Sequence, residues 1–344
     1  MNKETVLGAE KEVKVWWCLQ DVCVREDGKM VVVYAHSVYL LSASGEEESK
    51  FNVDGEGRGR LQLKSPYGVC EDEKYTYVSD NGNARIVVYD KRTREWVRLL
   101  CGNGLGSGKK QLWDPRQVRV HGKFLYVADY ANHRVQIFST EDWQLKHTLG
   151  GNGRGSRINQ FNGPSGLHVD DKDIFVTEEG GCCVKVFNNI IQGVAPQDWV
   201  ASRDWMIPRD WMITLGGNGD NLFNRPQGVC ANDTHVFVSD SRDNRIQVFE
   251  RGSGRLVQSV NGVEEPRGMC MRNGRLYVTC WDSKFIHVFG DLPFEVHREL
   301  GRLGAVNKVG RRRALAVLLL MRRIELRKKA RVVKTKKKVD SRRF

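Results

Sequence analysis

Several protein classes are excluded by what the sequence lacks. The longest apolar run, ALAVLLLM from Ala314, has eight residues, far below the roughly 20 that a membrane-spanning helix needs. The first residues, MNKETVLGAEKEVKV, are too charged for a secretory leader. Nine cysteines in 344 residues form no disulfide framework by count or spacing, which is typical of a reducing compartment. We therefore expect an intracellular, cytoplasmic protein.

Catalytic signatures are also missing. The sequence contains no HExxH, GxSxG or paired-carboxylate motif, and its eight histidines share no spacing. We therefore expect a protein without catalytic residues, metal or cofactor. The alternative is a metal-dependent hydrolase or lyase that gathers its ligands from several repeats around a central channel.

The net charge of +13 is concentrated at the end of the sequence. Residues 301–344 contain 17 lysines and arginines but two acidic residues, whereas the rest of the chain has 38 basic and 40 acidic side chains. Only this segment argues for a polyanionic partner. Its apolar positions 314, 317, 318, 321 and 324 fit one helix face, so we expect a basic amphipathic helix or a disordered tail. An anionic membrane surface, nucleic acid, an acidic partner and nuclear import are the alternative roles.

The remaining residues are repeats, of which 115–153 is the clearest copy. It has four short runs, QVRV, FLYVAD, RVQIF and WQLKHTL, most of which alternate apolar with polar residues as half-buried strands do. Copies begin at residues 66, 115, 164, 226 and 266, with spacings of 49, 49, 62 and 40, and a further copy begins near Asp21. In chain order the copy near Asp21 is the first and the copy at residue 266 is the sixth. Four strands in roughly 40 to 50 residues are the period of a β-propeller blade. We predict an all-β, six-bladed β-propeller of four-stranded antiparallel blades over residues 18–300.

Two segments have open interpretations. The outer strand that closes the ring against the last blade comes either from residues 1–17 or from EVHRELGR, which begins at Glu295. Residues 198–213 contain three Asp-Trp pairs at a spacing of six. We interpret them as a tolerated insertion at a solvent edge, with an aromatic binding loop as the alternative.

A shared motif carries a family resemblance. Two copies contain P-x-G-V or a close variant followed by V-[SA]-D-x-x-N-x-R, and a third has Asp243 at the Asn position, with the Asn displaced to Asn244. The sequence therefore resembles NHL-repeat β-propellers of the NHL/TolB-like type, including the propeller part of tripartite-motif NHL proteins. The matching residues, which we interpret as structural because they recur around the ring, are Asp80, Asn83, Arg85, Asp129, Asn132, Arg134, Asp240 and Arg245. The fourth copy departs, with Glu178, Gly181 and Cys183 at the Asp, Asn and Arg positions, and so does the sixth, with Cys280, Ser283 and Phe285.

Basic and aromatic residues gather in the loops that should open on one face of such a ring. Strands alternate in direction, so the links into the first strands and the loops between second and third strands share this face. The binding candidates there are Lys64, Tyr67, Trp113, Arg116, Tyr130, Arg225, Gln227, Arg242, Arg267, Trp281 and Lys284. Such residues can form a protein interface or bind single-stranded RNA. The alternative is that they are ordinary solvent-exposed loop residues without a binding role.

A second set of residues should line the channel. Cys23, Cys70, Cys230 and Cys270 share one position of the first strand, and Arg119 and His168 take it in the third and fourth copies. A thiol ring could bind metal, but free cysteines are more often small buried hydrophobic residues, and we favour that interpretation.

The resemblance implies a binding platform. We predict a monomeric, non-enzymatic propeller for protein partners, with RNA binding as the alternative. Proteins with this repeat often carry a zinc-binding ubiquitin-ligase module, but no Cys/His cluster of that kind precedes the repeats here. A role in ubiquitination would therefore be limited to substrate reading.

Overall fold

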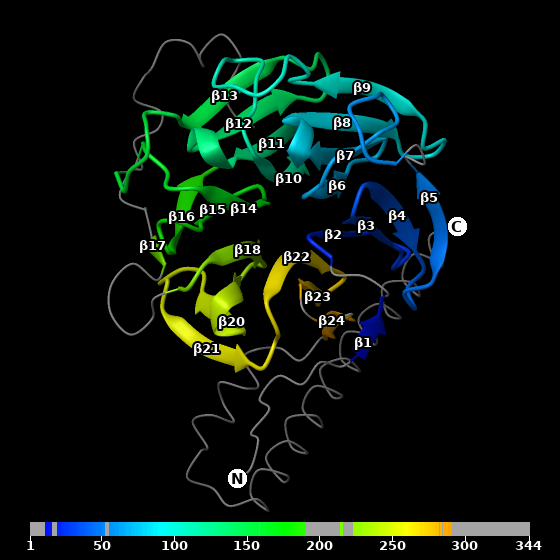
Figure 1. The fold of residues 1–344 in the computed structure, drawn as a ribbon. Coiled ribbons are helices and arrows are strands. Elements are labelled where there is room, and N and C mark those ends of the chain that lie inside the picture. Colours follow the sequence, from blue (N-terminus) through cyan, green and yellow to red (C-terminus); the bar gives the residue numbers. More distant parts are fainter. Residues whose placement is uncertain are drawn as a thin grey trace, which may run out of the picture. The chain divides into compact units, whose positions relative to one another are not determined.

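The computed structural model describes residues 11–15, 19–51, 55–157, 159–189, 214–215, 223–281, 283 and 285–290. These residues form six four-stranded antiparallel sheets arranged around a central axis, with the first strand of each sheet innermost (Figure 1). The prediction of an all-β, six-bladed propeller is confirmed. Residues 291–344 form a separate unit, which lies outside the described residues together with the segment 198–213.

Each blade is one sheet, and the blades are numbered in chain order from the copy that begins near Asp21. Blade one contains β2 (Val22–Val24), β3 (Met30–Tyr34), β4 (Ser37–Leu41) and β5 (Glu47–Phe51). Blade two contains β6 (Val69–Glu71), β7 (Tyr75–Asp80), β8 (Arg85–Asp90) and β9 (Trp96–Leu100). Blade three contains β10 (Pro115–His121), β11 (Phe124–Asp129), β12 (Arg134–Ser139) and β13 (Leu145–Gly150).

The other three blades repeat this order. Blade four contains β14 (Pro164–Val169), β15 (Asp173–Glu178), β16 (Cys183–Asn188) and β17 (Thr214–Leu215). Blade five contains β18 (Pro226–Ala231), β19 (His235–Asp240), β20 (Arg245–Glu250) and β21 (Leu256–Asn261). Blade six contains β22 (Pro266–Arg272), β23 (Arg275–Cys280), β24 (Phe285–Phe289) and β1 (Lys11–Lys14). Short 3-10 helices join the second and third strands of blades two, three and five: η1 (Asn81–Asn83), η2 (Tyr130–Asn132) and η3 (Ser241–Asp243).

The ring is closed by the start of the chain. Strand β1 pairs antiparallel with β24, with Lys11 opposite Val288 and Lys14 opposite Phe285. Val13 and Val15 are buried in the same apolar cluster as side chains of β3, β4 and β24. This pairing gives β24 a fourth-strand partner and covers an edge that would otherwise be open to aggregation. The competing segment at Glu295 lies outside the described residues.

The core lies between neighbouring blades rather than at one centre. Alternation along each strand sends every second side chain toward the adjacent sheet. Between blades two and three, Tyr77 of β7 packs in one buried cluster with Leu125 and Val127 of β11. Such layers hold each blade against the next, and they leave the loops at the two ends of the strands available for other roles.

Candidate functional site

Six side chains from the innermost strands meet at one end of the channel. They occupy the x position of the P-x-G-V motif or its equivalent, and we call them the mouth residues: Gln20, Tyr67, Arg116, Ser165, Gln227 and Arg267. The Tyr67 hydroxyl of blade two donates a 2.8 Å hydrogen bond to Gln227 Oε1 of blade five. Arg267 Nη1 donates to Gln20 Oε1 at 2.8 Å, and Arg116 Nη1 donates to Ser165 Oγ at 3.3 Å. The first bond crosses the ring and the other two join neighbouring blades, so side chains at the mouth bind one another.

Glu179 is the carboxylate that pairs with the arginines at this mouth, and it was not among the residues predicted from the sequence. It follows β15 and forms ion pairs with Arg116 of blade three and Arg225 before blade five. Burial alone would raise the pKa of Glu179, but the two guanidinium groups outweigh burial and lower it. The signal that could have identified it is register, because Glu179 takes the position that Tyr130 and Trp281 hold in their blades.

The arginines at the mouth also cover aromatic faces. The Arg116 guanidinium lies 3.4 Å from the centroid of the Tyr130 ring and 5.5 Å from that of Tyr67. In blade six, Arg267 lies 4.2 Å from the centroid of Trp281. Rings that are covered in this way are not free to stack on a base.

The remaining binding candidates are more accessible. Trp113 is 47% exposed, and Lys64 is exposed with its Nζ 3.7 Å from Glu56 Oε1. Arg242 is exposed at η3. Lys284 lies outside the described residues. The structure therefore separates the predicted face into a mouth of mutually paired side chains and an outer set that solvent reaches.

The repeated Asp-x-x-Asn-x-Arg motif binds the link that precedes each blade. Asp129 Oδ1 accepts a 2.7 Å hydrogen bond from the Trp113 amide, and its Oδ2 accepts from Asn132 at 2.8 Å and from Arg134 at 2.7 Å. Arg134 in turn donates to the carbonyl oxygens of Ser107, Gly108 and Gln111. The arginine thus pairs with the aspartate of its own repeat and with the backbone of the link.

Blades two and five repeat most of these contacts. Asp80 accepts from the Lys64 amide, from Asn83 and from Arg85, and the Arg85 guanidinium donates to three carbonyl oxygens of its link. Asp240 accepts from the Asn224 amide and from Arg245. The same arrangement around the ring supports our proposal that these residues are structural.

Blade four achieves the same contacts with different residues. Glu178 Oε2 accepts from the Asn162 amide at 2.9 Å, and its Oε1 lies 2.7 Å from Lys185 Nζ. Lys185 donates to the carbonyl oxygens of Arg157 and Gln160, at 3.0 and 2.6 Å. Cys183 occupies the position that arginine holds in the other blades with this motif, so blade four has no arginine there. Two residues further along β16 on the same face, Lys185 supplies the missing cation.

Replacing Lys185 with methionine is expected to lower the free energy of unfolding by about 3 kcal/mol, because it leaves Glu178 buried without a counter-charge. Lys185 and Glu178 are both almost fully buried. Urea denaturation would measure the loss. The double variant Glu178→Met/Lys185→Met should recover part of it, and Lys172→Met, at an exposed pair with Asp233, should cost under about 0.5 kcal/mol. Equal losses for Lys185→Met and Lys172→Met would contradict the assignment.

Just inside the mouth, the channel is crossed by a polar bridge. Four blades have glycine after the mouth residue because the strands are close: a Cβ at Gly166 would lie 2.1 Å from the Gln227 carbonyl oxygen. The two exceptions bind each other, since Gln117 Nε2 donates to Asp21 Oδ1 at 2.9 Å. Gln117 Oε1 accepts from the Leu167 amide at 2.6 Å, which connects blades one, three and four.

Arg119 completes this bridge. Its Nη1 lies 2.8 Å from Asp21 Oδ2, and its Nη2 donates to the Met269 carbonyl oxygen at 3.1 Å. Burial alone would lower the pKa of Arg119, but the charge of Asp21 raises it above its ordinary value. Arg119, which was predicted to line the channel, therefore forms an ion pair with Asp21, and the Asp21 side chain is fully buried.

The cysteines lie one step further along the channel with His168. Burial raises the pKa of all four channel thiols, that of Cys230 to about 12, so they remain protonated at neutral pH. Burial also lowers the pKa of His168, whose Nε2 lies 3.5 Å from Asp170. Among the described residues no group of three His, Cys, Asp or Glu side chains is placed to hold a metal ion. Cys23, Cys70 and Cys270 line a cavity of 1220 Å³ together with Arg119 and with the turns that follow β2, β6, β10 and β22.

Comparisons with known proteins agree with the fold. The family model of the NHL repeat matches residues 223–249, which include β18, β19 and most of β20. A chain in the structure "Crystal structure of Nidogen/Laminin Complex" is similar at a TM-score of 0.54 and 16% identity, over 74% of this chain and 84% of that one. The curated proteins contain no match. In the part of the chain that is described, no helix has the length and apolarity that crossing a bilayer would require.

Proposed function

We propose that this chain, an NHL-repeat β-propeller, is a non-enzymatic scaffold that binds a protein partner through the links entering blades two and three. The NHL propeller is generally a non-catalytic fold used for protein interaction. The link surface, as we name it, consists of Leu61, Leu105 and Trp113 with the backbone that carries them.

One observation carries this proposal. The large hydrophobic side chains that stand exposed among the described residues are Leu61 at 43%, Leu105 at 56% and Trp113 at 47%, and all three belong to two successive links. Single exposed apolar residues are ordinary, whereas a group in neighbouring loops marks a binding surface. Trp is also one of the residue types that dominate interface energetics.

The indole is held on an ordered backbone. The Trp113 amide donates to Asp129, and Leu105 forms a parallel bridge with Leu112, the residue before Trp113. Because the link is fixed before a partner arrives, less conformational entropy is lost on binding. This is the arrangement expected of an interface anchor.

A protein partner is favoured over RNA on this face. Two of the aromatic rings on which RNA bases could stack, Tyr130 and Trp281, are covered by Arg116 and Arg267. The similar solved structure is described as a complex of nidogen with laminin, which are both proteins. At 16% identity that likeness supports the fold's capacity for protein binding and names no partner for this chain.

Replacing Trp113 with alanine is expected to weaken partner binding by about 2 kcal/mol, roughly thirtyfold in Kd, because it removes the aromatic anchor. Partners would be recovered by affinity purification with the full chain and identified by mass spectrometry, and Kd would then be measured with the purified partner. Arg275→Ala, a change at an exposed residue of β23 that is not among the binding candidates, is the control and should bind as the unaltered chain does.

Two outcomes would overturn this proposal. Recovery of every partner by Trp113→Ala and by the unaltered chain alike would show that the link surface is not the interface. Loss of the recovered material on ribonuclease treatment would assign the propeller to RNA instead. A thermal melt of Trp113→Ala must match that of the unaltered chain, since the side chain is half exposed and little folding energy depends on it.

A further inference from the structure

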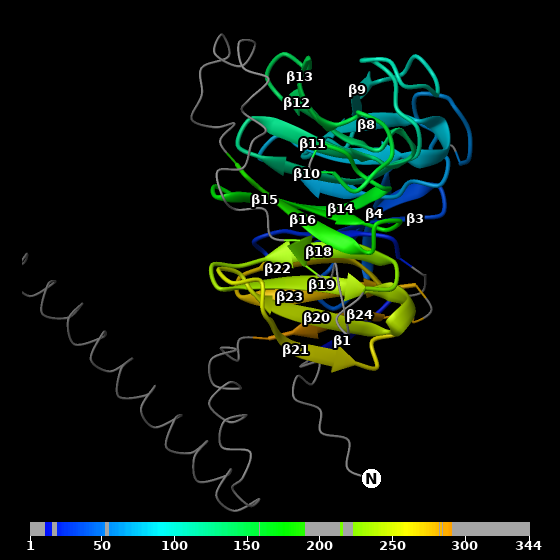
Figure 2. The same ribbon diagram turned by 90° about the vertical axis from the view of Figure 1, so that its left-hand side faces the viewer.

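We propose that the groove between the outer strands of blades two and three binds an acidic, carboxylate-rich segment of the protein partner. This inference rests on the proposed function and names the chemistry of what the scaffold would bind. The groove has a volume of 590 Å³ and extends from the link at 101–110 to residues 143–148, beside β9 and β13. Figures 1 and 2 show these two strands at the outer edge of their blades.

The groove is lined by cations and by no carboxylate among the described residues. Its charged lining consists of Arg98, Lys109, Lys110 and Lys146. Lys146 pairs with Asp142 at 2.5 Å, and none of the other three forms an ion pair with a described residue. Three uncompensated positive charges at one groove attract an anion and repel one another until it arrives.

This surplus is local rather than a property of the whole ring. Outside residues 301–344 the chain has 38 basic and 40 acidic side chains. In such a body, a groove without a single acidic residue is a departure from the average. Surface charge that merely keeps a protein soluble is interspersed with the opposite sign, as it is elsewhere on this ring.

The nearby aromatic residue does not offer a base-stacking platform. Arg98 covers the Trp143 ring, with 5.1 Å between the guanidinium carbon and the ring centroid. Trp143 also packs edge-on against Tyr75 at 5.2 Å. A planar guanidinium held in this way still presents its N–H groups to a carboxylate, which it can bind in a bidentate manner. The lining therefore favours carboxylates over nucleic-acid bases.

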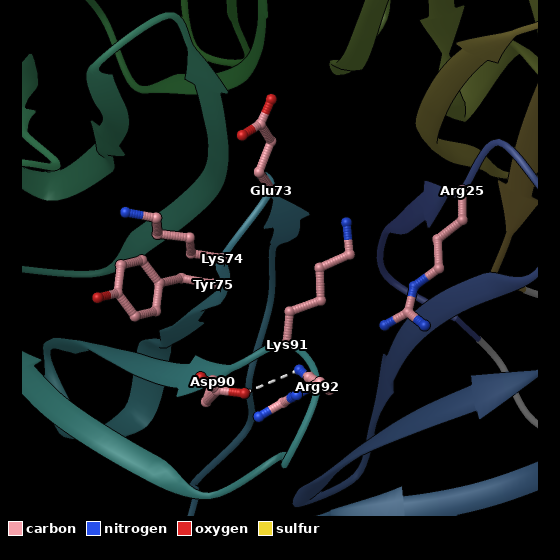
Figure 3. Close-up of a pocket in the computed structure, with 7 residues that line it drawn as sticks. All are labelled: Arg25, Glu73, Lys74, Tyr75, Asp90, Lys91 and Arg92. Atoms are coloured by element: carbon pink, nitrogen blue, oxygen red, sulfur yellow. Dashed lines mark hydrogen bonds between the residues drawn. The ribbon is translucent and has the colours of Figure 1, made fainter.

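A second pocket provides the comparison. It has a volume of 500 Å³ and is lined by Arg25, Glu73, Lys74, Tyr75, Asp90, Lys91 and Arg92 (Figure 3). Two of its four cations are compensated: Arg25 binds Glu71 through two hydrogen bonds, and Lys91 Nζ lies 3.7 Å from the same carboxylate. Glu73 and Asp90 also line it, so an acidic ligand would meet repulsion there.

The groove also adjoins the link surface. Lys109 and Lys110 lie in the same link as Leu105 and Trp113, and they precede Trp113 by four and three residues. A partner segment that places an apolar side chain on Trp113 can therefore continue into the groove with its acidic residues. The two sites would then act as an apolar anchor and a charged continuation of one interface.

The test uses the full chain and a fluorescein-labelled deca-glutamate peptide at physiological salt, with binding read by fluorescence anisotropy. The double reversal Lys109→Glu/Lys110→Glu should weaken binding at least tenfold. The matched control Lys74→Glu/Arg92→Glu makes the same change of charge at exposed residues of the Figure 3 pocket, and it should change binding less than twofold. Both variants retain residues 301–344, so any binding by that basic segment is common to them. Hydrogen exchange should slow at 98–103 and 143–148 when the peptide binds.

Three results would overturn the proposal: equal weakening by the two double variants, no slowing of exchange at the groove, or tighter groove-dependent binding of poly(U) than of deca-glutamate. The last would assign the groove to nucleic acid. Failure here is distinguishable from failure of the proposed function, because deca-glutamate contains no apolar residue and Trp113→Ala should leave its binding unchanged. Partner binding that depends on Trp113 without peptide binding would remove only the groove.

Discussion

Replacing Asp129 with alanine is expected to lower the free energy of unfolding by about 4 kcal/mol, because a fully buried carboxylate is removed from three hydrogen bonds, one of which is also its ion pair with Arg134. Arg134 would retain its bonds to the link carbonyls but lose its counter-charge. The loss would be measured by urea denaturation at pH 7. Asp233→Ala is the control, since its carboxylate is 90% exposed, and it should cost under about 0.5 kcal/mol.

The same change should loosen the link surface. Asp129 accepts from the Trp113 amide, and Arg134 holds three carbonyl oxygens between Ser107 and Gln111. Amide exchange in residues 105–113 is therefore expected to accelerate more than exchange in blade five, which has its own aspartate at Asp240. A loss under about 1 kcal/mol, or acceleration spread evenly over all blades, would show that the motif does not organise the link.

This coupling gives the repeat motif an indirect part in recognition. The Asp-x-x-Asn-x-Arg residues touch no partner in our proposal, yet they fix the backbone from which Leu105 and Trp113 project. The mouth residues have a comparable role, because Arg116 joins Tyr130, Ser165 and Glu179 from two blades. Rigid loops on a closed ring lose little entropy on binding, which suits a scaffold.

Local patterns in the sequence were sufficient to predict the blades. The alternation in runs such as FLYVAD and RVQIF and the recurrence of P-x-G-V give strands β11 and β12 and the entry strands of five blades. Blade one lacks the proline but keeps the order of runs. These signals depend on residues close together in the chain, where strand geometry alone determines which side chains are buried.

The contacts within the channel could not be predicted in the same way. Tyr67 and Gln227 are 160 residues apart, and Asp21 and Arg119 are 98 apart, so only closure of the ring brings them together. Asp21 and Gln117 are visible in the sequence only as departures from glycine in the entry motif. Lys185 was missed because a longer glutamate at Glu178 moves the cation two residues along the strand. The available signal was that Asp21 and Gln117 both depart from the repeat, which suggests that the two residues contact each other.

Replacing Asp21 with alanine is expected to cost about 5 kcal/mol of unfolding free energy, because it leaves Arg119 and Gln117 without their buried partner. The double variant Asp21→Ala/Arg119→Met should recover a substantial part of this, and urea denaturation of the four combinations gives the coupling energy of the pair. Independent losses that simply add would contradict a bridge between blades one and three.

The pH dependence of thiol alkylation tests the charge of this bridge separately from its contribution to stability. Arg119 lowers and Asp21 raises the pKa of Cys270, although burial has the largest effect and keeps the thiol protonated. Removing Asp21 leaves the cation uncompensated, so the pKa of Cys270 should fall and alkylation by iodoacetamide under native conditions should begin at lower pH. Arg119→Met should shift the alkylation profile to higher pH. Profiles that move in the same direction in the two variants would mean that alkylation reports general loosening, and the electrostatic role of the bridge would then be wrong.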